Sequence, residues 1–248
     1  MDIILVFNWK MNPVTLEEAI GLAKASDYNG VIIMPPFLFI EEIGKVLKRA
    51  NLGAQDLSWE EKGAFTGEVS AEELKNLGVE YVIVGHSERR KKLNETDVMI
   101  NKKVLAALKA GLKVILCIGE DLKIRQRGEK AVEKFIGNHL KKDLKRISLL
   151  VVGHKSLVRN LTIAYEPVWA IGTGYSDSPK DAVEMIKFIK SLVISHWSLV
   201  PLVLYGGSVS GKNIADFVKY KEIGGFLIGG ASLKSADIKQ IIKTCLKK

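Results

Sequence analysis

Short apolar runs recur along the chain, and the segments between them carry apolar residues at helical spacing. Most of the runs are apolar throughout, which is typical of parallel strands covered on both faces. Residues 15–26 and 181–193 repeat their apolar positions with the period of a helix that buries one face. The pattern predicts helices alternating with eight strands: Ile3–Phe7, Val31–Met34, Leu52–Ala54, Tyr81–Val84, Val114–Cys117, Thr162–Tyr165, Leu202–Tyr205 and Phe226–Ile228.

Eight strand and helix units within 248 residues predict an α/β protein folded as a closed (β/α)8 barrel. A doubly wound sheet is the structural alternative, but no G-x-G-x-x-G follows the first predicted strand. No linker, low-complexity stretch or block of charge divides the chain. Residues 1–248 are therefore predicted to form one domain.

Composition places the chain among ordinary globular proteins, with 47% hydrophobic and 26% charged residues. No apolar run reaches the ~18 residues that a membrane span requires. The N-terminus lacks the basic start and cleavage site of a signal peptide, so we expect a cytoplasmic protein with no membrane partner. Cys117 and Cys245 do not form a disulfide framework and are predicted to be free thiols.

The net charge of +9 raises the question of a nucleic-acid partner. The lysines are spread along helical stretches such as residues 123–145, with no interleaved aromatic side chains on which bases would stack. A solvated basic surface is thus favoured, and it would also speed the arrival of an anionic substrate. Nucleic-acid binding rests on charge alone, and steeply salt-dependent binding would be its signature.

Polar residues and glycines follow directly after the predicted strands. The carboxyl ends of barrel strands converge on one face, where ligands bind, so these residues are expected to meet there. Because side chains alternate along a strand, Asn8 and Lys10 can share one side, as can His86 and Glu88 if the strand geometry persists. The set comprises Asn8, Lys10, His86, Glu88, Glu120, Glu166, Gly206–Ser208, Gly229 and Gly230.

Residues 164–174 place one carboxylate, that of Glu166, between a strand and a loop that ends in glycines. Pro167 stops the strand ladder because it has no N–H group. Gly172 and Gly174 permit the backbone angles of a hinge. This arrangement is typical of a catalytic base that is covered by a movable loop.

Seven motifs, in this order, resemble those of the triosephosphate isomerase family, and together they span nearly the whole chain. The resemblance implies a single TIM-barrel domain. It also implies reversible interconversion of dihydroxyacetone phosphate and D-glyceraldehyde 3-phosphate through an enediolate, in glycolysis and gluconeogenesis, with no cofactor and no metal. The motifs are Phe7–Asn12, Gly63–Ser70, Gly85–Arg90, Cys117–Glu120, Ala164–Gly174, Tyr205–Val209 and Gly229–Leu233.

The resemblance assigns Glu166 as the base and His86 as a neutral electrophile, whose pKa the following helix would lower. Lys10 and Asn8 would stabilise the enediolate, and Glu88 would be the counter-ion of Lys10. These roles belong to the family's established mechanism and are inherited rather than deduced from the residues. A non-catalytic sugar-phosphate-binding barrel is the alternative, but it would have lost Glu166 or His86, and both are present.

Other roles implied by the resemblance concern the phosphate and the loop after Glu166. Glycine allows close approach of the backbone to an anion, so the phosphate would bind N–H groups of the late loops. The phosphate-binding positions are Gly172, Ser208, Gly229 and Gly230. Ile171 and Leu227 would cover the Glu166 side chain. Tyr205 and Ser208 would form hydrogen bonds with the closed loop. Trp169 would move from near Tyr165 toward Glu120.

The resemblance also implies a homodimer, in which Thr66 of the loop Gly63–Ser70 would reach the partner subunit beside Asn8 and Lys10.

The chain departs from the family pattern in two places. The stretch before the sixth strand is about ten residues longer, around residues 148–161, and we expect a peripheral excursion there. Lys190 and Gly224 stand where the family often has Arg and Asp in a structural ion pair.

Overall fold

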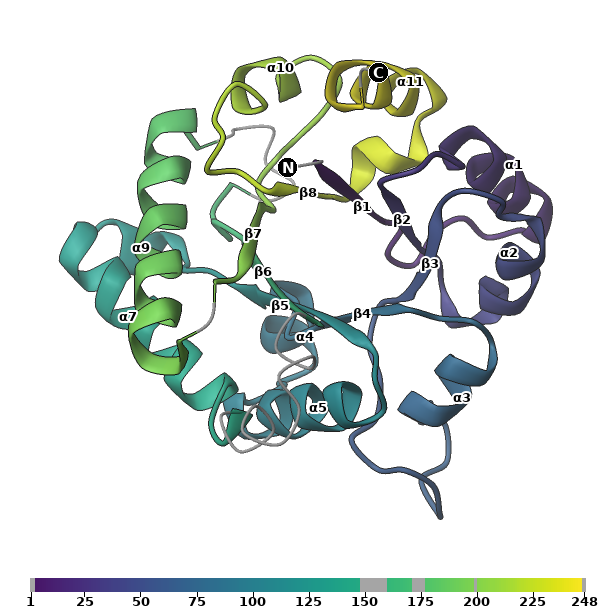
Figure 1. Cartoon of the computed structure of the whole chain (residues 1–248), viewed down its shortest axis with the longest axis horizontal. Helices are drawn as coiled ribbons and strands as arrows, with labels where there is room; N and C mark the ends of the chain where they lie inside the picture. Colours follow the sequence, from purple (N-terminus) through teal and green to yellow (C-terminus); the bar gives the residue numbers. More distant parts are fainter. Residues whose placement is uncertain (1–2, 148–159, 171–176, 199, 247–248) are drawn as a thin grey trace.

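The computed structural model describes residues 3–147, 160–170, 177–198 and 200–246, and it shows eight parallel strands closed into a barrel (Figure 1). The strands follow one another around the barrel in chain order, and β1 pairs with both β2 and β8 to close it. The predicted (β/α)8 barrel is thus confirmed. The strands are β1 Ile4–Asn8, β2 Val31–Met34, β3 Asn51–Ala54, β4 Tyr81–Val84, β5 Lys113–Ile118, β6 Leu161–Tyr165, β7 Leu202–Tyr205 and β8 Gly225–Ile228.

Helices surround the barrel in the connections between strands (Figure 1). The α-helices are α1 Leu16–Ser26, α2 Ile40–Val46, α3 Ala71–Asn76, α4 Ser87–Lys92, α5 Asp97–Lys109, α6 Leu122–Arg125, α7 Glu129–Asp143, α9 Pro179–Trp197, α10 Ile214–Phe217 and α11 Ser235–Cys245. Two short 3-10 helices are η1 Phe37–Phe39 and η3 Gly230–Leu233. None of the helices in the part of the chain described here is long and apolar enough to span a bilayer.

The sequence pattern located every strand but placed several ends one residue away from their observed positions. Asn8, Asn51 and Lys113 join strands because their backbone groups enter the ladder, although their side chains are polar. Thr15 lies just before α1 and caps it, since its hydroxyl accepts a bond from the Glu18 N–H. Ser178 caps α9 in the same way, and this helix extends beyond the predicted 181–193 at both ends.

Side chains of alternate strand residues fill two separate apolar layers. The inner layer lies within the barrel and consists of Val6, Ile32, Met34, Ile83, Ile115, Cys117, Ala164, Leu204 and Leu227. The outer layer, between strands and helices, takes the neighbouring residues such as Leu5 and Phe7. Asn8 and Glu166 each lie two residues beyond an inner-layer residue, Val6 and Ala164. Strand alternation therefore aims both side chains toward the axis at the carboxyl end of the barrel.

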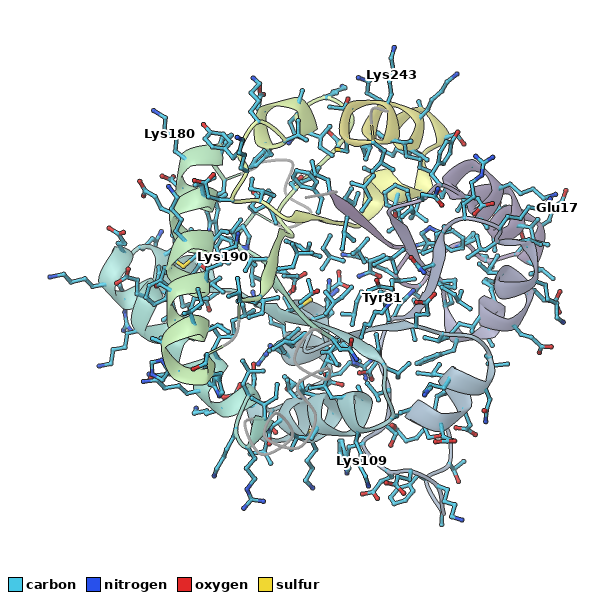
Figure 2. The ribbon with its side chains drawn as sticks, viewed as in Figure 1. Glu17, Tyr81, Lys109, Lys180, Lys190 and Lys243 are labelled. Carbon is cyan, nitrogen blue, oxygen red and sulfur yellow. The ribbon has the colours of Figure 1, made fainter. Side chains whose placement is uncertain are left out.

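The basic surface lies on the outside of the helices. Figure 2 shows Lys109, Lys180 and Lys243 pointing away from the barrel, whereas Tyr81 lies close to its interior. All three lysines are exposed, and Tyr81 packs against the inner layer. Cys117 is buried, and both cysteines are free thiols, as predicted.

A buried group of charges links α5 to the loops after β3 and α4. Lys103 is 3% exposed, and its Nζ lies 2.8 and 2.7 Å from the two carboxylate oxygens of Asp56 and 2.5 Å from Glu95 Oε1. Arg89 contacts the same two acids, at 2.8 Å from Asp56 and 2.7 Å from Glu95. Burial raises the pKa of Asp56 to about 6, although both cations lower it.

The two departures from the family pattern differ in outcome. Lys190 Nζ donates a hydrogen bond to the backbone oxygen of Glu222 at 2.6 Å. This hydrogen bond replaces the ion pair that other family members often form with residue 224. Burial lowers the pKa of Lys190. The longer stretch before β6 lies largely at residues 148–159, outside the described residues.

Candidate active site

Glu166 lies directly after β6 at the carboxyl end of the barrel, and its side chain is 2% exposed. Its Oε1 lies 3.1 Å from His86 Nε2, and its Oε2 accepts a hydrogen bond from the Ser87 N–H at 3.1 Å. Burial by itself would raise the pKa of the carboxyl, but these partners outweigh burial, and the pKa of Glu166 is lowered. The side chain is therefore an ionised carboxylate at neutral pH.

His86 caps α4, the helix that follows β4. Its Nδ1 accepts a hydrogen bond from the Glu88 N–H at 3.2 Å, while Nε2 faces Glu166. Both contacts fit the neutral tautomer that carries its hydrogen on Nε2. Burial disfavours the charged ring, but the Glu166 carboxylate outweighs it, so the pKa of His86 is raised rather than lowered in this arrangement.

Lys10 and Glu88 form an ion pair at 2.5 Å, as the family resemblance implied. Strand alternation does not bring Lys10 to the site, because β1 ends at Asn8 and Lys10 has a left-handed backbone, with φ of 56°. Its N–H donates to Asn8 Oδ1 at 3.0 Å, and its carbonyl accepts from Gln55 Nε2 at 2.7 Å. Likewise β4 ends before His86, and the turn into α4 directs both His86 and Glu88 toward the site.

A cavity of about 270 Å³ joins these residues to the loops after β7 and β8. A side-chain carbon at Gly229 would lie 3.1 Å from Lys10 Cε, which is closer than ordinary van der Waals contact, so the lysine would have to shift by a few tenths of an ångström to admit it. Leu227 is 4% exposed and lines the same cavity beside Glu166. The lining residues are Asn8, Lys10, His86, Glu166, Gly206–Ser210, Leu227, Gly229–Ala231, Lys234 and Asp237.

Glu120 follows β5 and is fully buried beside the segment after Glu166. Tyr165 Oη lies 3.2 Å from both of its oxygens, and Trp169 Nε1 donates to Oε1 at 2.9 Å. Burial raises the pKa of Glu120. The Trp169 side chain is thus hydrogen-bonded to Glu120 in this structure. Tyr205 Oη accepts the Asp177 N–H at 3.2 Å, at the far end of the loop.

Three predicted positions, Ile171, Gly172 and Gly174, lie outside the described residues. Ser208, Gly229 and Gly230 lie together at the cavity, and Thr66 lies away from it on an exposed loop. Among the residues described, no group of three or more His, Cys, Asp or Glu side chains is arranged to hold a metal ion.

Four residues that shape the site were missed by sequence reasoning. Gln55 follows β3 directly, so the same signal of a polar residue after a strand would have found it. Ser87 contributes its backbone N–H, and the pattern of side chains in a sequence gives no information on such backbone contacts. Arg125 and Asp177 meet only in the tertiary structure, with 3.4 Å between Nη2 and Oδ1.

Known proteins resemble this chain over almost its entire length. The family model described as triosephosphate isomerase matches residues 3–245. A triosephosphate isomerase from Thermoanaerobacter pseudethanolicus is 45% identical over 256 residues, covering 96% of this chain and 98% of that protein. Those from Dictyoglomus thermophilum and Moorella thermoacetica are 40% and 39% identical, over 97% and 96% of this chain and 98% and 97% of theirs. This chain belongs to the triosephosphate isomerase family.

Proposed function

We propose that the protein interconverts dihydroxyacetone phosphate and D-glyceraldehyde 3-phosphate without a cofactor. The observation that carries the proposal is the contact between a buried carboxylate and an imidazole, Glu166 and His86, beside the cation Lys10. A base, a hydrogen-bond donor and a positive charge at one cavity are the groups that an enediolate intermediate requires. The non-catalytic alternative has no observation in its favour, because both Glu166 and His86 are present and in contact.

In this mechanism Glu166 takes a proton from one substrate carbon and returns it to the adjacent carbon, while the hydroxyl proton on the first carbon's oxygen passes to the oxygen of the second. The Nε2–H of His86 donates to the substrate oxygens while negative charge develops on them, and Lys10 and the Asn8 amide stabilise that charge. Glu166 and His86 now contact each other at 3.1 Å, so substrate must part them in order to engage both. Separation from His86 removes the largest of the interactions that lower the pKa of Glu166, and the carboxylate becomes a stronger base.

The phosphate group is assigned to the end of the cavity formed by Ser208, Gly229 and Gly230, together with Gly172. Close approach of Lys10 to Gly229 supports this assignment, because it puts a positive charge at the same end. Ile171 and Leu227 would exclude water from Glu166 after substrate binds. We further propose that Tyr205 and Ser208 bond the closed loop and that Trp169 reaches Glu120 by moving from near Tyr165.

The direct test is turnover of D-glyceraldehyde 3-phosphate by the purified protein, with product measured by a coupled enzyme. We expect turnover without added metal, and we expect it to persist after treatment with a chelator. Phosphoglycolate, which carries a carboxylate in place of the enediolate, should compete with substrate. A protein that binds phosphoglycolate but gives no turnover would instead be the non-catalytic barrel.

We also infer a homodimer, in which the loop that carries Thr66 docks beside Asn8 and Lys10 of the other subunit. Exposed large apolar side chains in the segments that follow β1 and β2 support this inference: Met11 is 92%, Val14 87% and Leu38 89% exposed. Burial of exposed apolar side chains is a common reason for association. Sedimentation at micromolar concentration should give a mass twice that of one chain, and an active monomer would contradict the inference.

Residues 1–248 are proposed to act as one domain, because the closed barrel draws strands from both halves of the chain. The family's part in glycolysis and gluconeogenesis supports a cytoplasmic location. The scattered exposed lysines support steering of anionic substrates, and they provide no argument for a nucleic-acid partner beyond their charge.

A further inference from the structure

Arg125 contacts both ends of the segment that follows Glu166. Its guanidinium carbon lies 5.5 Å from the centre of the Trp169 ring, three residues beyond Glu166. Its Nη2 lies 3.4 Å from Oδ1 of Asp177, on the far side of residues 171–176. Its Nη1 lies 3.9 Å from Glu120 Oε1. A single guanidinium therefore lies against the start of the segment, its end and the acid that anchors it.

Asp177 is held in a buried position that a carboxylate occupies only at an energetic cost. Its side chain is 2% exposed, and its Oδ1 also accepts the Ser178 N–H at 3.0 Å. Its Oδ2 is buried and has no hydrogen-bond partner among the residues that the structure describes. Burial raises the pKa of Asp177 to about 6, although Arg125 lowers it. The ion pair with Arg125 is thus the main interaction that offsets the burial of this charge.

The start of the segment is tied to the same place by hydrogen bonds. The Val168 N–H donates to the Glu120 backbone oxygen at 3.0 Å, and the Trp169 indole donates to the Glu120 side chain at 2.9 Å. The Glu166 N–H donates to the Ile118 oxygen at 2.8 Å. Movement of Arg125 away from Trp169 and Glu120 would therefore be transmitted to the backbone next to Glu166.

We propose that Asp177 is a positioning residue for the reaction. It holds Arg125 against Trp169 and Glu120 and so fixes residues 166–170, which include Glu166. This inference rests on the proposed function, because it takes Glu166 to be the base. Asp177 touches no substrate. Its effect passes through Arg125, and a misplacement of the base by about 1 Å is enough to lower a rate by about 10²-fold.

The charges around Asp177 determine how the ion pair responds to pH. Arg125 interacts with three acids, namely Asp177, Glu120 and Asp181, and with Tyr165 of β6 and Tyr205 of β7. Asp177 becomes protonated as pH falls through about 6, and it then attracts Arg125 less strongly. After Asp177 is protonated, Glu120 and Asp181 still attract Arg125. The Arg125 side chain therefore shifts to a new position and stays bound there.

Asp181 offers a matched control. It lies 3.6 Å from the same Nη2 of Arg125, but its side chain is 50% exposed, and it belongs to α9 rather than to the segment. Asp177→Asn and Asp181→Asn remove the same charge near the same guanidinium. We expect Asp177→Asn to lower kcat/KM by about 10-fold or more, mainly through kcat. We expect Asp181→Asn to stay within about twofold of the unchanged protein, since exposed ion pairs contribute little.

A second measurement does not require turnover. With 5-fluorotryptophan in place of tryptophan, the fluorine resonance of Trp169 is identified by its loss in Trp169→Phe. We expect this resonance to shift with a midpoint near pH 6 in the unchanged protein and in Asp181→Asn, and to lose that shift in Asp177→Asn. A titration that persists in Asp177→Asn overturns the proposal, as does its absence from the unchanged protein.

The two measurements separate this inference from the proposed function. If the unchanged protein turns over substrate and Asp177→Asn loses the titration but keeps full kcat/KM, the link to Glu166 is wrong. If the unchanged protein gives no turnover, the proposed function fails. The fluorine titration then still decides whether Asp177 controls the surroundings of Trp169.

Discussion

Replacement of Glu166 by glutamine is expected to lower kcat by about 10³-fold while phosphoglycolate still binds. Glutamine has nearly the same shape as glutamate and still accepts the Ser87 N–H through its oxygen, but it cannot take a proton from carbon at neutral pH. The loss should therefore fall on kcat, with KM changed much less. Steady-state kinetics in both reaction directions would measure it, because one base serves both.

Glu88→Gln is the control for this variant. It also removes a carboxylate next to the site, yet Glu88 pairs with Lys10 and is 38% exposed rather than enclosed. We expect a smaller loss from Glu88→Gln than from Glu166→Gln, because Lys10 keeps its charge. Equal turnover by Glu166→Gln and the unchanged protein would refute the role of Glu166 as the base.

Replacement of Lys103 by methionine is expected to lower the free energy of unfolding by about 3–5 kcal/mol. Lys103 is 3% exposed and contacts both Asp56 and Glu95, so its removal leaves two buried carboxylates with Arg89 as their remaining cation. Methionine fills a similar volume without a charge. Urea unfolding followed by circular dichroism, at one fixed protein concentration, would measure the change.

Lys109→Met on the same helix is the matched control. Lys109 lies 2.6 Å from Glu61, a distance close to those of Lys103, but both side chains are more than two-thirds exposed, at 71% and 75%. We expect Lys109→Met to change stability by less than about 0.5 kcal/mol. Similar losses of unfolding free energy in Lys103→Met and Lys109→Met would show that the burial of Lys103 does not explain its effect.

The defect of Lys103→Met should grow as pH rises. Burial already raises the pKa of Asp56 to about 6, and loss of Lys103 raises it further. Above the ordinary pKa of 3.8, unfolded chains have released this proton while folded chains retain it, so stability falls with increasing pH through the folded pKa. The difference from the unchanged protein is therefore expected to be larger at pH 8 than at pH 5.

The sequence by itself determined the barrel and the face on which the site lies. Eight apolar runs with helical segments between them have few ways to bury both faces of each strand, and closure into a barrel is one of them. Polar residues at strand ends, such as Asn8 and Glu166, then converge because the carboxyl ends of all strands share one rim. The catalytic roles came from the family resemblance, and these roles remain proposals.

Only the tertiary structure decided how the side chains meet. Lys10 reaches the site through a left-handed backbone, and His86 reaches it as a helix cap, so strand alternation alone would have misplaced both. The direction of the pKa shift of His86 depends on the distance to Glu166, which no spacing in the sequence reports. The contact of Arg125 with Asp177 joins residues 52 positions apart. Such contacts depend on side-chain packing in three dimensions. The hydrophobic periodicity of the sequence indicates only which residues of each helix or strand face the core.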